Sequence, residues 1–162
     1  MTNCPFTETA KEIATEASTQ SVLPLTAVGF WHGDLAGIAL SIDDGRTLKK
    51  GEGAELCGYL RAIAWWASAL LTNLEVDDPA ALFVAEWERA AVKHPGMTLD
   101  CDGHTDETRF YALAEEVGEV AAALTYDNAN TTGHNADLIA EVTQVGALAL
   151  AWLTRYQDGE ER

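Results

Sequence analysis

The fold is decided by two stretches in the second half of the chain: residues 106–126 read DETRFYALAEEVGEVAAALTY, and residues 135–156 read NADLIAEVTQVGALALAWLTRY. Both repeat apolar side chains at steps of three and four residues, which is the pattern of an amphipathic helix. These positions are Phe110, Leu113, Val117, Val120 and Leu124, then Leu138, Val142, Val145, Leu148, Ala149 and Trp152. Residues 127–133 have the composition of a loop, so we expect two antiparallel helices joined by a turn.

Three further helices are predicted upstream of this pair. Residues 6–20 carry a short amphipathic pattern, and residues 53–73 carry a longer one with a single apolar stripe. A third helix is expected over residues 79–94, because Asp77-Asp78-Pro79 is a strong helix start and His94-Pro95-Gly96 a strong stop.

Residues 21–52 are the hardest part of the chain to interpret, because they are rich in glycine. Asp43-Asp44-Gly45 is a turn signal between short apolar runs, so we expect a small hairpin or irregular segment near residues 36–50. The expected fold class is all-α: an antiparallel bundle of four or five helices with that segment attached.

The composition is that of a single globular domain over residues 1–162, with 48% hydrophobic and 22% charged residues. Within it, residues 1–78 have no role that we can assign, and residues 79–157 hold the helices of interest. The three cysteines are odd in number and form no CxxC, which indicates reduced thiols. The chain starts without the basic and apolar run of a signal peptide, so we expect a cytoplasmic protein.

The chain is strongly acidic, with a net charge of -16 from 26 acidic and 10 basic residues. Such a surface repels nucleic acid backbones and anionic membranes, so neither is expected as a partner. It also repels a free triphosphate, so an acidic protein that handles nucleotides needs a divalent cation between its carboxylates and the phosphates. On charge alone, solubility is the simpler explanation.

Acidic side chains are spaced for convergence on the two helices quoted above. Glu116 and Glu119 are three residues apart and share a helix face, as do Glu141 and Gln144 on the next helix. Two packed antiparallel helices can aim all four side chains at one point, and such oxygen ligands suit Mg²⁺ or Mn²⁺. A solvated acidic face explains the same residues, and the spacing alone leaves both interpretations open.

The stretches FYALAEEVGEVA (residues 110–121) and DLIAEVTQV (residues 137–145) resemble the MazG-like family of all-α nucleoside triphosphate pyrophosphohydrolases. That family carries ExxE and ExxD pairs on paired helices, and the resemblance covers about residues 79–156. It implies a MazG-like bundle that hydrolyses a (d)NTP of the (deoxy)nucleotide pool to the (d)NMP and pyrophosphate. It also implies two or more Mg²⁺ ions, replaceable by Mn²⁺, and a homodimer or homotetramer.

The resemblance carries over to residues one at a time. It implies that Glu116, Glu119 and Glu141 bind metal, whereas Gln144 stands where most members have Asp and offers only a neutral amide oxygen. The uncharged amide would weaken one metal site, shift it to another carboxylate such as Asp137 or Glu115, or signal lost catalysis. Either Glu119 or Glu115 would accept the proton of the attacking water.

Substrate-binding residues are expected on the helix before this pair and at the start of the first acidic helix. Arg89, Lys93 and Arg109 are the candidates for the phosphates because basic residues are scarce here, although surface solubility explains Arg89 and Lys93 equally. Trp87 either forms a wall for the base or packs in the core. Two functional alternatives remain open: a non-catalytic metal- or nucleotide-binding module, and an acidic interaction protein that mimics nucleic acid.

Overall fold

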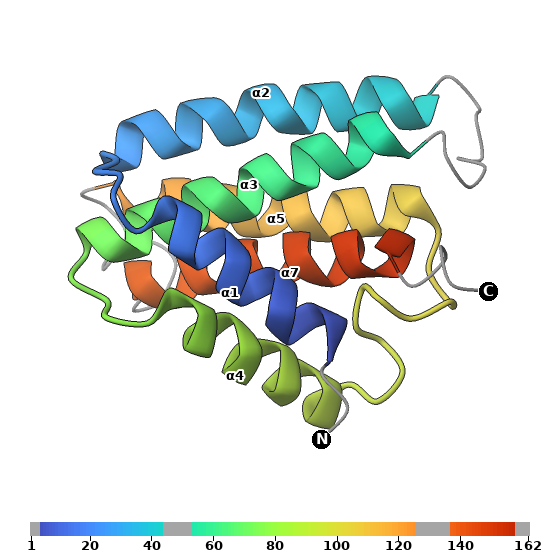
Figure 1. The fold of residues 1–162 in the computed structure, drawn as a ribbon. Coiled ribbons are helices and arrows are strands. Elements are labelled where there is room, and N and C mark those ends of the chain that lie inside the picture. The colour runs from blue at the N-terminus through green and yellow to red at the C-terminus, as the bar shows by residue number, and fades with distance from the viewer. Residues whose placement is uncertain (1–3, 44–52, 126–136, 158–162) are drawn as a thin grey trace.

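A computed structural model describes residues 4–43, 53–125 and 137–157, and all the regular secondary structure in these ranges is helical. The helices are α1 (Pro5–Ala17), α2 (Pro24–Asp43), α3 (Ala54–Asn73), α4 (Pro79–Lys93), α5 (Asp106–Ala123) and α7 (Leu138–Gln157) (Figure 1). The predicted all-α fold is confirmed. The described residues form six helices, whereas four or five were expected.

The bundle is built around α3 and α7. Helix α7 packs against α3, α5, α4 and α1, and α2 packs against both α3 and α5. Figure 1 shows α2, α3, α5 and α7 lying side by side, with α1 and α4 covering one side of α3 and α7. The core between them is apolar, and its largest fully buried side chains include Trp31, Phe83, Ile63 and Trp152.

Helix boundaries agree with the predicted patterns where a cap fixes them. The side chain of Asp78 accepts a hydrogen bond from the backbone N–H of Ala81 at 3.0 Å, which starts α4 at the predicted proline. Thr105 caps α5 in the same way, accepting from the N–H of Thr108 at 3.1 Å. The predicted loop at residues 127–133 lies outside the described residues.

The hairpin predicted near residues 36–50 is wrong in the part that the structure describes. Residues 38–42, which were expected to form its first strand, belong to α2. Trp31, Leu35 and Ile38 recur at helical steps and are buried in the core, so tertiary packing outweighs the turn signal and the glycines. The Asp44-Gly45 turn and the second run lie outside the described residues.

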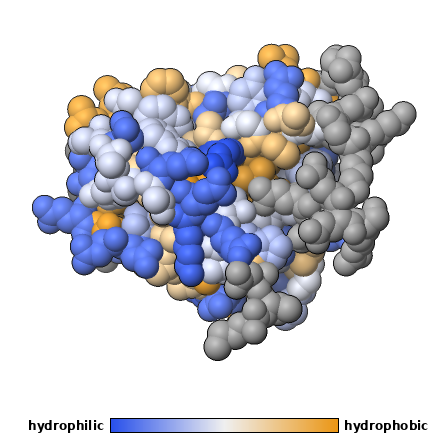
Figure 2. Space-filling model, in the orientation of Figure 1, coloured by the Kyte–Doolittle hydropathy of each residue, from blue (hydrophilic) through white to orange (hydrophobic). Residues whose placement is uncertain are grey.

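Helix α2 differs from the other helices in how much apolar surface it leaves exposed. Its window from Pro24 to Ile42 is long and apolar enough to cross a membrane, judged by length and composition alone, yet only 22% of it is buried. Among its exposed side chains are Leu25, Phe30 and Leu40. Hydrophobic residues are seen along the upper edge of the molecule in Figure 2, where α2 lies in Figure 1.

Candidate metal centre

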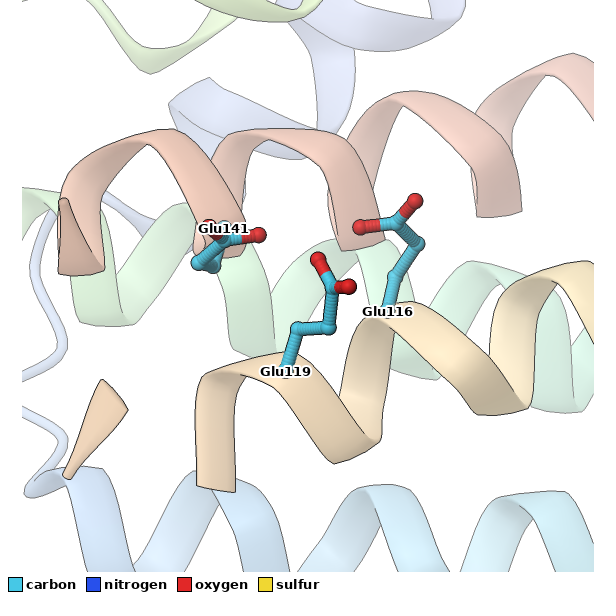
Figure 3. Close-up of side chains that lie close together, drawn as sticks. All are labelled: Glu116, Glu119 and Glu141. Atoms are coloured by element: carbon cyan, nitrogen blue, oxygen red, sulfur yellow. The ribbon is translucent and has the colours of Figure 1, made fainter. Parts of the chain in front are cut away.

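Three glutamates from two helices converge on one point beside the seam between α5 and α7. Helix α5 provides Glu116 and Glu119, one turn apart, and α7 provides Glu141 (Figure 3). One carboxylate oxygen from each side chain lies within 4.8 Å of the other two. We refer to Glu116, Glu119 and Glu141 as the carboxylate cluster.

The apolar seam positions these side chains. Val117 and Val120 of α5 are buried against the core, as are Val142 and Val145 of α7. Each glutamate of the cluster stands next to one of these valines in the sequence and therefore lies at the border of the seam. As a result, Glu116 and Glu141 are partly buried and Glu119 is exposed.

Glu116 is a partly buried acid surrounded by other carboxylates. Burial first, and then the negative charges of Glu119, Glu141, Glu115 and Glu86 in that order, raise the pKa of Glu116 to about 7. Its Oε2 atom is buried and has no hydrogen-bond partner among the described residues. A buried carboxylate oxygen without a partner costs free energy, which a cation bound in the cluster would offset.

Gln144 lies beside Glu141 and is hydrogen-bonded to it. The Gln144 Nε2 atom donates a hydrogen bond to Oε2 of Glu141 at 3.0 Å. An aspartate at this position would place a fourth negative charge next to Glu141, whereas the amide donates a hydrogen bond to it and adds none. In this arrangement Gln144 orients a carboxylate of the cluster.

The two acids that were expected to supply the missing charge lie outside the cluster. Oδ1 of Asp137 accepts a hydrogen bond from the backbone N–H of Ile139 at 3.0 Å, so this side chain caps the start of α7. Glu115 is exposed on α5, and its charge contributes to the raised pKa of Glu116.

A further carboxylate that the sequence did not single out comes from α4. The side chain of Glu86 is only 17% exposed, and its charge also contributes to the raised pKa of Glu116. Arg89 holds it through two hydrogen bonds, from Nε at 2.7 Å and from a terminal nitrogen at 2.6 Å. The available signal was an acid on the apolar side of a helix, between Phe83 and Trp87.

Arg89 and Lys93 occupy the outer side of α4. Together with Ala85, Glu88 and Val92 they line a shallow open depression. Arg89 has a raised pKa, caused mainly by its hydrogen bonds and charge interaction with Glu86, and Glu116 adds to the effect. Arg89 is thus a cation within electrostatic range of the carboxylate cluster.

Trp87 and Arg109 have structural contacts away from the cluster. The Trp87 ring stacks on Phe6 of α1 with centroids 4.9 Å apart, and its Nε1 donates to Asp100. Arg109 is 1% exposed and donates hydrogen bonds to the carbonyls of Leu99, Cys101 and His104 and to Asp106. The substrate role predicted for Arg109 does not fit this placement, because its guanidinium is used to close the connector before α5.

The carboxylate cluster, its neighbour Gln144 and the Glu86–Arg89 pair together form the candidate site. The chain matches no protein-family model, no curated protein and no solved structure.

Proposed function

We propose that the protein is a metal-dependent nucleoside triphosphate pyrophosphohydrolase that converts a (d)NTP and water to the (d)NMP and pyrophosphate in the cytoplasm. The observation that carries this proposal is the convergence of Glu116, Glu119 and Glu141, whose ligand oxygens lie within 4.8 Å of one another, and the Oε2 atom of Glu116 is buried without a hydrogen-bond partner among the described residues. The resemblance of these residues and their helices to the MazG-like motif supports the same reaction.

The cluster fits a hard divalent cation in its chemistry and its size. All three donors are carboxylates, which Mg²⁺ and Mn²⁺ prefer. Two ligands on opposite sides of one Mg²⁺ lie roughly 4 Å apart, so carboxylate oxygens within 4.8 Å need only small rotations to share an ion. Glu116, Glu119 and Glu141 would hold the cation, which would supply positive charge for the charge that develops at the α-phosphorus.

Proton transfer and the orientation of the carboxylates are assigned to side chains of the chain. Glu119 is the exposed member of the cluster and accepts the proton of the attacking water, with Glu115 as the alternative base. The water oxygen bonds to the α-phosphorus, the bond from that phosphorus to the bridging oxygen breaks, and pyrophosphate leaves with the electron pair. Gln144 keeps Glu141 oriented through its hydrogen bond.

Cations for the phosphates come from α4. Arg89 is already drawn toward the cluster by Glu86, and Lys93 lies one turn further along the same outer surface. A triphosphate that enters with its metal can take over the hydrogen bonds that Arg89 now gives to Glu86. Trp87 is stacked on Phe6, which favours its role in core packing over that of a wall for the base.

A nucleotide screen tests the proposal directly. The purified protein is incubated with canonical and modified (d)NTPs in Mg²⁺ or Mn²⁺, and NMP and pyrophosphate are separated by anion-exchange chromatography. We expect stoichiometric release of both products from at least one nucleotide and none in EDTA. Folded protein that releases no NMP from any nucleotide would rule out the reaction.

A non-catalytic binding module is the second candidate, and Gln144 is the observation that favours it. The neutral amide replaces an acid of the motif and is engaged with Glu141, so the cluster holds three carboxylates. Such a module would bind a nucleotide in a metal-dependent way without turnover. Calorimetric titration of inactive nucleotides from the same screen, with Mg²⁺ and with EDTA, separates the two candidates.

A further inference from the structure

Aromatic rings and one acid form a strip along the contact between α2 and α3. The ring of Phe30 stacks on Trp66 with centroids 4.2 Å apart. A Cβ atom added to Gly37 would collide with the ring of Tyr59, so that ring lies directly against α2. Asp34 is one helical turn from Phe30 and one turn from Gly37, and it therefore stands between the two ring contacts. We refer to Phe30, Asp34, Tyr59 and Trp66 as the aromatic strip.

The aromatic strip is accessible from solvent. Phe30 covers Trp66 with one face of its ring and is 50% exposed, and the other three members are partly exposed. The core contacts of α2 come from the neighbouring side of the helix, where Trp31 is fully buried and its Nε1 donates to the carbonyl of Ile63 at 3.1 Å. A ligand can therefore reach the strip without displacing the core.

Asp34 is the charged member of the strip, and one of its oxygens is not satisfied. The Oδ2 atom is buried and has no hydrogen-bond partner among the described residues. Burial raises the pKa of Asp34 to about 6. Tyr59 has a raised pKa mainly because of its hydrogen bond to Glu55 and the charge of Glu55, and the charge of Asp34 adds to it. A positively charged donor bound at Asp34 would offset the cost of this buried oxygen.

The chemistry of the strip favours one kind of cation. Aromatic faces attract organic cations, and guanidinium stacks on them better than ammonium because it is planar and more weakly hydrated. A guanidinium also donates two parallel hydrogen bonds to one carboxylate. A hard divalent cation requires several oxygen ligands, which a single carboxylate among rings does not supply. The net charge of -16 attracts cations to the surface as a whole.

We propose that the aromatic strip binds a guanidinium group, which donates to the carboxylate of Asp34 while its plane lies against the exposed face of Phe30. Rotation about χ2 of Asp34 can present both oxygens to this ligand, because that torsion has broad minima. The ring of Tyr59 bounds the site on the side of Gly37. The strip lies on different helices from the carboxylate cluster, so the proposal is independent of the hydrolase activity.

Two ligands of equal charge test the choice of cation. N-acetyl-arginine methylamide and N-acetyl-lysine methylamide are titrated into the full chain in EDTA at constant ionic strength, and the aromatic resonances are followed by NMR. We expect the arginine compound to bind with a Kd on the order of 1 mM, about tenfold more tightly than the lysine compound, and to shift the resonances of Phe30 and Trp66. Equal binding of the two compounds, or no binding of either, overturns the proposal.

Asp34→Asn tests the carboxylate. The asparagine keeps the size of the side chain and removes its charge, so the arginine compound should bind about 10- to 100-fold more weakly. Asp77→Asn is the matched control, because it removes the same charge from an exposed position outside the strip, and it should bind like the wild-type protein. Wild-type affinity in Asp34→Asn overturns the proposal.

Phe30→Leu tests the ring, since leucine is apolar but has no aromatic face. The affinity should fall about two- to fivefold, whereas Tyr111→Leu, which removes a 61% exposed ring from α5, should have no effect. An unchanged affinity in Phe30→Leu contradicts the proposed stacking.

The source of the guanidinium is separated by comparing methylguanidinium with a pentapeptide that has a central arginine between glycines. Tighter binding of the pentapeptide assigns the strip to an arginine side chain of a protein partner. Equal affinities assign it to a free guanidino compound.

Discussion

The seam between α5 and α7 holds carboxylates that are partly withdrawn from water, whereas the outer face of α2 holds leucines that are almost fully exposed to it. Each placement opposes the solvation preference of its side chains. In the seam, the buried Oε2 of Glu116 has no hydrogen-bond partner among the described residues, and on α2 Leu25 and Leu40 are 84% and 74% exposed. A bound cation would stabilise the first region, whereas burial against an apolar surface would stabilise the second.

The two regions also differ in how their side chains are held. Gln144 and Arg89 orient Glu141 and Glu86 through hydrogen bonds, so the acidic region is organised before any partner arrives. On α2, the exposed side chains of Leu25 and Leu40 have no polar atoms and so are not held by hydrogen bonds. Substitutions that affect one region and not the other therefore test both interpretations.

Glu119→Gln is expected to give the largest effect, a loss of turnover of about 10²–10⁴-fold, because the amide cannot accept a proton from water. Initial rates of NMP release measure it, with circular dichroism to show that the fold is retained.

Glu107→Gln on the same helix is the matched control, since Glu107 is exposed and lies toward the opposite end of α5. Its rate should equal that of the wild-type protein. Full activity in Glu119→Gln together with a loss in Glu115→Gln would transfer the role of base to Glu115.

Mg²⁺ or Mn²⁺ is expected to stabilise the folded protein. A ligand at about 100 times its Kd that binds only the folded state adds about 2.7 kcal/mol, so the Tm should rise by several degrees over the value in EDTA. Differential scanning calorimetry at pH 7.5 measures the shift. Glu141→Gln should abolish most of it, and an equal shift in wild-type and variant would place metal binding outside the cluster.

Much of the site was predictable because it depends on local spacing. Helix periodicity placed Glu116 and Glu119 on one face of α5 and Glu141 on α7, and the apolar stripes required those helices to pack together. The structure brings these three side chains together. Gln144 was recognised as the odd residue, but its hydrogen bond to Glu141 depends on rotamers that the sequence does not define.

Features that depend on tertiary packing could not be predicted in the same way. Glu86 approaches the cluster because α4 packs on α7, and no motif links the two helices. Arg109 is satisfied by carbonyls of the connector, whose path has no periodic signal. In α2, burial of Trp31 and Ile38 outweighed the glycines and the turn signal, so a strand was predicted where a helix forms.

Glu116→Gln is expected to stabilise the metal-free protein at alkaline pH. The pKa of Glu116 in the folded state, about 7, lies above its ordinary value of 4.5. The contribution of Glu116 to the free energy of unfolding is therefore fully present below pH 4.5 and is lost as the pH rises through 7. The glutamine variant avoids this loss and should gain on the order of 1–2 kcal/mol at pH 8, since solvent screens part of the effect. Urea unfolding in EDTA at pH 5 and pH 8 measures the difference. No gain at pH 8 relative to pH 5 would contradict the burial of this charge.

Asp34→Asn gives the smallest expected effect and sharpens the comparison between the two regions. Burial alone raises the pKa of Asp34 on α2 to about 6, and its Oδ2 atom is buried without a hydrogen-bond partner among the described residues. As for Glu116, the contribution of Asp34 to the free energy of unfolding is present below the ordinary pKa of 3.8 and is lost as the pH rises through 6. The asparagine variant avoids this loss, so its free energy of unfolding at pH 8 should exceed that of the wild-type protein by less than about 1 kcal/mol. Unlike Glu116, Asp34 has no second carboxylate among the causes of its raised pKa. The Tm shift with Mg²⁺ should therefore be unchanged in Asp34→Asn and lost in Glu116→Gln. If both variants lose the Tm shift, replacing a partly buried carboxylate outside the cluster also removes the effect of Mg²⁺. The shift would then give no evidence that the cation binds in the carboxylate cluster.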